Sequence, residues 1–454
     1  MNYCESEKII VQPTRYLYER KLVFLFFFLL LLDGILRKWL LPSFSTPIMI
    51  VKQILAIYMV FVGYKNGLIK NGWATFSVVL GCISFVTTLL FGHHDLLIAF
   101  WGCQNWWFGI PLCIFIAKVV TKRDLFFILR VVIFFSIVNG IITALQYFSP
   151  ITSFLNKQIG GEFVDKFHRG AAISELGGMF RCSGIFGYIS QSSIFQPLAL
   201  GCLLFFFLTH KRILFRYNNL ILLLAVITYI LTCAFSISRT TIFVSLFSVI
   251  FILVGAFKLV TKLKNIVYYL PVFLLIISFV LSRPIVNQGI ETLTTRFESI
   301  DKEEGAVKGN VEDIVHRGIL YTVDAVINPK TLDGEDVPFW GFGQGISTQV
   351  GGRLAGIGSK NSGFAYAEWD SKRIVCESGL LLGVIMLFCR LGFVLSFLLV
   401  IYRRTKVGIY LPLFLYPGFF WGFFFLNQWG NTFMFNFALL CGGLFLSSLK
   451  YRNI

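Results

Sequence analysis

Long apolar segments recur along the chain, and each is long enough to cross a lipid bilayer. A spanning helix needs about 20 mostly apolar residues. The 454 residues are 56% hydrophobic and 14% charged, which is more apolar surface than a soluble fold can bury. We therefore predict an all-α polytopic membrane protein with about twelve transmembrane helices, near residues 17–36, 47–64, 73–92, 97–118, 125–147, 193–209, 218–236, 239–257, 266–282, 377–401, 409–426 and 430–449.

Basic residues in alternate short connections orient these helices. Lysine and arginine collect on the cytoplasmic side of membrane proteins. Such clusters lie near 65–70, 118–123, 211–216, 258–264, 403–406 and 450–452. We therefore expect a multi-pass protein with both termini in the cytoplasm. Topology then accounts for much of the net charge of +17, and nucleic acid is not an expected partner.

The same orientation gives two long connections on the outer face. Residues 1–282 hold the first nine predicted helices, with an outer loop near 150–192. Residues 283–376 form a large extracytoplasmic loop, and residues 377–454 hold the last three helices. The late loop is the one segment long enough for a small extracytoplasmic domain.

Basic residues also recur on the predicted outer face, where the positive-inside rule does not call for them. They are Arg37, Lys38, Arg181, Arg239, Arg317, Arg353 and Arg373. Guanidinium groups have forked donors that suit phosphate or pyrophosphate oxygens, and nearby lipid strengthens the attraction. Charges at a membrane boundary are functional candidates by default. We expect a cationic pocket at the outer membrane surface.

The stretch LLDGILRKWLLP allows a structural alternative. Arg37 follows Asp33 by four positions, so the two can form an ordinary helical ion pair. Lys38 could instead extend to the lipid headgroups. Arg239, in the short turn SISRTT, is the stronger functional candidate.

Other polar motifs give weaker signals. The turn His93-His94-Asp95 places adjacent imidazoles in different directions, which does not suit a metal. The ten cysteines are scattered, mostly within apolar spans, so we predict neither a disulfide framework nor a metal site. No cofactor is expected. Gln104 and Asn105 either bond to neighbouring helices or line a cavity.

Several segments, taken in order, resemble the O-antigen ligase and polymerase superfamily. They are RCSGIFGYISQSSIFQPLAL, SISRTTIFVSL, the late loop with WGFGQGI, and CESGLLLGVIML, which opens with Glu377; DGILRKWLLP is similar to an N-terminal signature of a polymerase-like branch. The resemblance covers most of the chain. It implies a polytopic enzyme of the bacterial cytoplasmic (inner) membrane that acts on undecaprenyl-diphosphate-linked glycans.

One departure from the family pattern favours polymerisation over ligation. Ligases of the superfamily carry a His-Asn pair about nine residues before the glutamate that opens the helix after the loop. Here that place is occupied by Ala367-Glu368. Glu368 could act as a general base on a sugar hydroxyl, or it could pair with Lys372.

The resemblance implies metal-independent, inverting glycosyl transfer that extends O-antigen or exopolysaccharide. Arg239 and Glu368 are the expected catalytic residues, and Arg181 the second expected contact to the diphosphate. The remaining outer basic residues are expected to support substrate binding, with Asp33 and Glu377 in structural roles. The expected partners are the lipid-linked glycan, membrane lipid, a chain-length regulator and a flippase.

Three alternatives remain open at this point. The chain could transfer a finished glycan in the manner of a ligase. It could be a flippase or transporter for the lipid-linked glycan, which about twelve spans with both termini inside would also suit. It could also be a non-catalytic scaffold of an export complex, which would not need so many outer arginines.

Overall fold

The computed structural model describes most of the helical part of the chain. The described residues are 16–150, 152–161, 181–209, 218–256, 321–331, 334–354, 370–424 and 427–451; of these, Asn218, Arg239, Tyr321 and Arg353 are described by backbone alone. The predicted helix at 266–282 lies outside this part, as do two stretches of the predicted late loop, 283–320 and 355–369.

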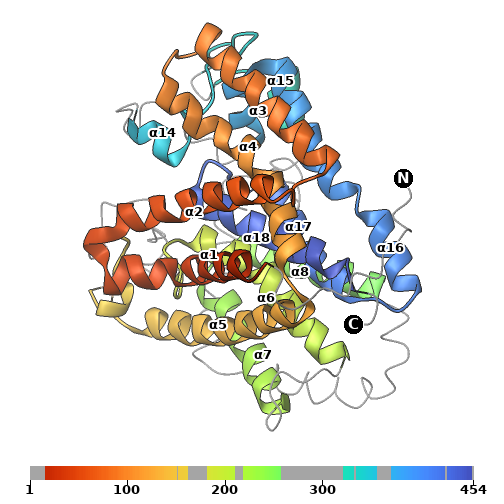
Figure 1. Cartoon of the computed structure of the whole chain (residues 1–454). Coiled ribbons are helices and arrows are strands. Elements are labelled where there is room, and N and C mark those ends of the chain that lie inside the picture. The colour runs from red at the N-terminus through yellow and green to blue at the C-terminus, as the bar shows by residue number, and fades with distance from the viewer. Residues whose placement is uncertain are drawn as a thin grey trace.

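The first described helices are long and closely connected (Figure 1). They are α1 (Leu17–Ile35), α2 (Ser45–Lys65), α3 (Gly72–Phe91), α4 (Leu96–Val119) and α5 (Lys122–Phe148). A π-helical turn, Leu36–Leu40, and a short 3-10 turn, Pro42–Phe44, join α1 to α2, and another 3-10 turn follows α5 at Phe154–Asn156.

The later helices include several short ones. They are α6 (Ile189–Thr209), α7 (Asn218–Phe235), α8 (Arg239–Gly255), α13 (Tyr321–Ile327), α14 (Gln349–Leu354), α15 (Asp370–Leu395), α16 (Leu398–Lys406), α17 (Leu411–Phe423) and α18 (Thr432–Ser448). The described residues contain no strand beyond an isolated bridge between Lys330 and Asp336.

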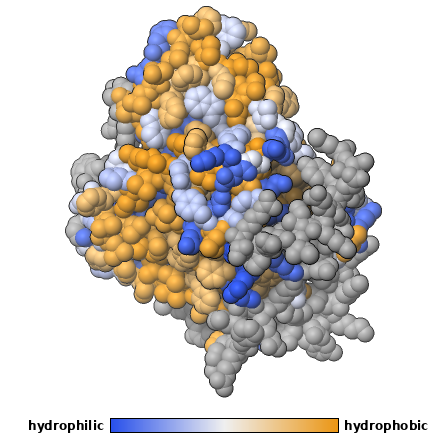
Figure 2. Space-filling view, viewed as in Figure 1, coloured by the Kyte–Doolittle hydropathy of each residue, from blue (hydrophilic) through white to orange (hydrophobic). Residues whose placement is uncertain are grey.

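Helix length and apolar composition confirm the class of the fold. Five helical stretches are long and apolar enough to span a membrane: Pro42–Lys65, Gly72–Phe91, Lys122–Phe148, Ile189–Thr209 and Asp370–Lys406. Helices α2 and α3 expose large apolar side chains, such as Phe61 and Val79, and Figure 2 shows a broad hydrophobic surface over these helices. The described part is therefore an all-helical membrane protein, whereas the number of twelve spans stays a prediction.

The helices pack as one bundle around apolar side chains. Helix α4 lies between α3 and α18, α5 packs on α7, and α6 packs on α17 and α8. In Figure 1, α1 runs between α2 and α5, where the Phe24 and Phe127 rings meet at 5.7 Å between centroids. This packing brings the end of α1, the start of α2 and the end of α5 to the same side of the bundle.

Two glycines determine the backbone path near the charged residues. A Cβ atom on Gly34 would lie 2.1 Å from the carbonyl oxygen of Ile185, so a bare glycine lets α1 touch the segment before α6. Gly379 has φ of 75° and interrupts α15. The residues before it fold back along the residues after it, and Asp370 thereby reaches Arg390.

Candidate functional site

Four charged residues are buried where α1 meets α2, and we call them the N-terminal charge cluster. They are Asp33, Arg37, Lys38 and Lys52, each at most 3% exposed. Asp33 accepts a hydrogen bond from Arg37 Nη1 at 3.3 Å through Oδ2 and one from Lys52 Nζ through Oδ1. Arg37 Nε also donates to Ser45 Oγ at 3.1 Å. A single carboxylate therefore pairs with two basic side chains.

The π-helical turn after α1 lets Arg37 and Lys38 both point inward. Successive residues of a regular α-helix point about 100° apart, so two adjacent long side chains rarely share one interior. Here the two side chains are buried against different partners, Arg37 against Asp33 and Lys38 against residues 183–186. Local π-helical geometry is frequent at functional sites.

Lys38 contacts uncharged oxygen atoms. Its Nζ donates to Ser183 Oγ, to the carbonyl of Gly184 and to the carbonyl of Phe186, each at 3.2 Å. Burial lowers the pKa of Lys38 to about 7, and the Cys182 thiol opposes this shift. The alternative in which Lys38 extends to the lipid headgroups is therefore wrong. Among the described residues, the cluster has three basic side chains and one acidic side chain.

Polar residues of α5 hold the segment that receives Lys38. Asn139 Oδ1 accepts from the backbone N–H of Ile185 at 3.1 Å, and Gln146 Oε1 accepts from that of Gly184 at 2.8 Å. Arg181, which is partly exposed, begins this segment two residues before Ser183. The structure thus brings Arg37 and Lys38 close to the segment that begins with Arg181.

Arg239 is the first residue of α8, directly after a short turn. The N-cap Ser238 accepts from the backbone N–H of Thr241 at 3.4 Å. Ser193 of α6 hydrogen-bonds with Thr241 Oγ1 at 2.8 Å, so the start of α8 lies beside the first turn of α6. The described backbone agrees with the short connection expected between the seventh and eighth helices.

A second set of four buried charges lies around the break in α15, and we call it the C-terminal charge cluster. Arg373 donates to Asp370 Oδ1 at 2.7 Å and to Glu377 Oε2 at 2.6 Å. Arg390 donates to the other oxygen of Asp370. Two carboxylates and two guanidinium groups thus alternate as Glu377, Arg373, Asp370 and Arg390.

The C-terminal cluster also fixes nearby backbone. Arg390 donates to the carbonyl oxygens of Phe423 at 3.0 Å, Phe424 at 2.9 Å and Asn427 at 3.1 Å. These carbonyls lie at the last residue of α17 and just after it, where the carbonyls of a helix lack internal partners. The Arg390 guanidinium lies 4.0 Å from the Trp429 ring centroid, within the range of a cation–π contact.

A network of side-chain amides lies between the two charge clusters. Gln53 Nε2 donates to Gln104 Oε1 at 3.0 Å, and Asn436 Nδ2 donates to Gln53 Oε1 at 2.8 Å. Asn105 Nδ2 donates to the Trp429 carbonyl at 3.1 Å. Gln53 directly follows Lys52 in α2, and Trp429 packs under Arg390, so the network connects the surroundings of both clusters.

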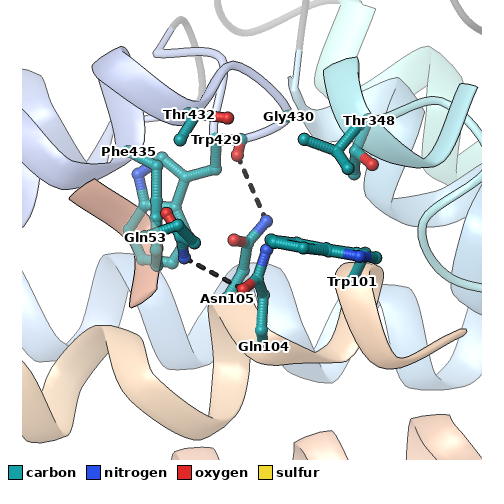
Figure 3. Close-up of a pocket in the computed structure, with 10 residues that line it drawn as sticks. Gln53, Trp101, Gln104, Asn105, Thr348, Trp429, Gly430, Thr432 and Phe435 are labelled. Carbon is teal, nitrogen blue, oxygen red and sulfur yellow. Dashed lines mark hydrogen bonds between the residues drawn. The ribbon is translucent and has the colours of Figure 1, made fainter. Parts of the chain in front are cut away.

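The network lines a small pocket (Figure 3). Its walls are Gln53, Trp101, Gln104, Asn105, Thr348, Val350, Trp429, Gly430, Thr432 and Phe435. Its volume is about 10 Å³, which is room for about one water molecule. Both interpretations of Gln104 and Asn105 therefore hold, because they bond to neighbouring elements and also line a cavity.

The structure describes only some of the remaining predicted site residues. Glu368 and Arg317 lie outside the described residues, and Arg353 is placed in α14 by its backbone alone. Arg373 is described, and its two carboxylate partners support a structural role, so its part in substrate binding stays a prediction. The described residues contain no group of three His, Cys, Asp or Glu side chains that could hold a metal ion.

Sequence reasoning missed Lys52, Asp370 and Arg390. Lys52 and Arg390 are isolated charges inside predicted apolar spans, and such residues are functional or structural candidates on that ground alone. Asp370 carries no comparable signal, because it lies among other polar residues in YAEWDSKR.

The long apolar helices of the described part define the class as an all-helical membrane protein. No protein-family model, curated protein or solved structure matches the chain.

Proposed function

We propose that the chain is a polymerase of the bacterial cytoplasmic membrane that joins undecaprenyl-diphosphate-linked oligosaccharide repeat units at the outer face. The products would be O-antigen or exopolysaccharide. The observation that supports this proposal is the excess of basic side chains in the N-terminal charge cluster, together with the sequence resemblance of the surrounding segments.

A buried excess of positive charge favours binding of an anion. Removing an ion from water is costly unless an opposite charge accompanies it. Among the described residues, Asp33 is the one acidic member of this cluster. It pairs with Arg37 and Lys52, whereas Lys38 bonds to neutral oxygen atoms. A lipid-linked diphosphate brings negative charge to a site at the end of membrane helices, and it needs no aqueous entry path through the bundle.

The proposed reaction uses the basic residues to stabilise the leaving group. The acceptor sugar hydroxyl attacks the anomeric carbon of the donor glycan, and its proton passes to Glu368. The bond between that carbon and the diphosphate oxygen breaks, and undecaprenyl diphosphate leaves with the electron pair. Arg239 and Arg181 would contact the diphosphate, supported by Arg37 and Lys38, because fixed positive groups stabilise the charge that develops.

The test is reconstitution of the full chain in lipid nanodiscs with a lipid-linked oligosaccharide. We expect longer lipid-linked products from the wild-type protein and fewer from Lys38→Met. The matched control is Lys330→Met, because Lys330 is a half-exposed lysine outside both clusters. Absence of longer products from the wild-type protein would overturn the proposal.

The same preparation separates the alternatives. In sealed vesicles, movement of the unextended donor across the bilayer would identify a flippase. Transfer of a finished glycan to a lipid or protein acceptor would identify ligase-type activity. A chain-length regulator and a flippase are proposed partners, to be sought by co-purification.

A further inference from the structure

Two polar atoms in the amide-lined pocket have no hydrogen bond within the described structure. Gln104 and Asn105 are 6% and 5% exposed, and each uses one end of its amide group, Gln104 Oε1 toward Gln53 and Asn105 Nδ2 toward the Trp429 carbonyl. Gln104 Nε2 and Asn105 Oδ1 are left over. Figure 3 shows the two side chains together at the pocket wall.

These left-over atoms match a ligand that both donates and accepts hydrogen bonds. Each of these atoms gains a hydrogen bond when such a group enters the pocket. One donor and one acceptor remain, and a hydroxyl group can serve both, since it has one O–H donor and two lone pairs. Water has the same capacity, and the volume of the pocket admits about one oxygen atom.

The described walls of the pocket do not favour a charged ligand. Among the residues that the structure describes, its lining consists of amides, threonines, aromatic rings, Val350 and Gly430, with no charged side chain. An ion that entered would therefore be desolvated without a compensating charge. The expected occupant is the uncharged polar part of a larger molecule.

The partly exposed Trp101 ring supplies a surface beside the opening. Figure 3 shows this ring edge-on, with Thr348 on the other side of the pocket. Flat indole rings offer a large apolar face with little loss of side-chain entropy. A sugar ring has an apolar face and hydroxyl groups at its edge, so it can lie against Trp101 while one hydroxyl enters the pocket.

We propose that this pocket is a sugar subsite, in which Gln104 and Asn105 bind one hydroxyl of the glycan and Trp101 contacts the sugar ring. The choice of a glycan as the larger molecule rests on the proposed function. Gln53 adjoins Lys52, and the Lys52 ammonium lies 5.5 Å from the Phe433 ring, next to Thr432 of the pocket wall. The subsite would therefore hold an uncharged sugar beside the anion-binding cluster.

Ligand-detected NMR on the full chain in nanodiscs tests the subsite directly. The probes are the methyl glycosides of glucose, galactose and N-acetylglucosamine at millimolar concentration, observed by saturation transfer from the protein. We expect transfer to at least one glycoside, and about tenfold weaker binding to Trp101→Leu, which is the loss expected for one contact of 1.4 kcal/mol.

Trp107→Leu is the matched control, because Trp107 belongs to the same helix but does not line the pocket. It should bind the glycosides like the wild-type protein. Gln104→Leu provides a second variant if Trp101→Leu does not give a sharp melting transition, and it should weaken binding to a similar extent.

The outcomes separate this inference from the proposed function. Absence of transfer to all three glycosides, or unchanged binding by both pocket variants, would mean that the pocket holds water alone and would overturn the inference. Glycoside binding that depends on Trp101 without any chain elongation would overturn the polymerase and leave the subsite standing. If both pocket variants elongate the glycan with unchanged kinetics, the subsite inference is wrong and the polymerase proposal stands.

Discussion

The two buried charge clusters contain similar residues but differ in their balance of charge. In the C-terminal cluster, two carboxylates and two guanidinium groups alternate, and the other N–H groups of Arg390 donate to backbone carbonyls. In the N-terminal cluster, one carboxylate serves two basic side chains, while Lys38 meets only neutral oxygens. A balanced cluster fixes geometry and attracts little, whereas an unbalanced one keeps an attraction for anions.

Asp370→Asn should give the largest effect, because it breaks the balanced cluster. Two buried guanidinium groups would lose their shared carboxylate, and arginine does not release its proton. We expect a loss of about 3–5 kcal/mol in the free energy of unfolding, measured by thermal melting in detergent. Asp336→Asn is the control, because Asp336 is highly exposed. Equal melting temperatures for the two variants would show that the cluster does not stabilise the fold.

Asp33→Asn should cost less, about 2–3 kcal/mol, because Lys52 can lose its proton when its carboxylate partner is removed. The comparison becomes sharper when inorganic pyrophosphate is added at millimolar concentration. We expect the anion to raise the melting temperature of Asp33→Asn, whose N-terminal cluster has lost its carboxylate, by more than that of Asp370→Asn, whose N-terminal cluster is intact. Equal increases in the two variants, or no increase in either, would remove the distinction between the clusters.

Lys38→Met should separate binding from stability. The change removes a basic group that has no carboxylate partner among the described residues, so the melting temperature should stay the same or rise slightly. The KM for the lipid-linked donor should increase roughly tenfold, the effect of losing one charge-assisted hydrogen bond. A large fall in melting temperature with an unchanged KM would make Lys38 a structural residue.

The smallest expected effect is a dependence on pH. Because the pKa of Lys38 is lowered to about 7, its positive charge is present below that pH and is lost as the pH rises through it. The wild-type KM for the donor should therefore rise a few-fold between pH 6 and 8. Lys38→Arg, whose guanidinium keeps its charge, should flatten this profile. Asp33, Arg37, Lys52 and Cys182 face the same region, and a profile that is equally steep in Lys38→Arg would show that Lys38 is not the titrating group.

The helices were predictable from the sequence wherever an apolar run coincides with one straight helix. The segments predicted at 125–147 and 430–449 are found as Lys122–Phe148 and Thr432–Ser448. The helix predicted at 377–401 instead begins at Asp370 and is interrupted at Gly379. Hydrophobicity reports how favourably a segment transfers into an apolar environment, and it carries no information on a backbone that folds back on itself.

The candidate site was predictable only where its contacts are local. The pair Asp33 and Arg37, four residues apart, is confirmed by their hydrogen bond. Lys52 and Arg390 acquire their carboxylate partners from 19 and 20 residues away, and the amide network joins Gln53 to Asn436 across 383 residues. Those pairings depend on which helices lie side by side, and a single sequence does not state that.

The order of the chain has a consequence for how the protein assembles. Asp33 and Arg37 lie on neighbouring turns at the end of α1, whereas Lys52 belongs to α2 and residues 183–186, which receive Lys38, come much later in the chain. The spacing of Asp33 and Arg37 allows those two charges to pair within a single helix. This ion pair can therefore form before the helices pack, which lowers the cost of placing both charges in an apolar environment.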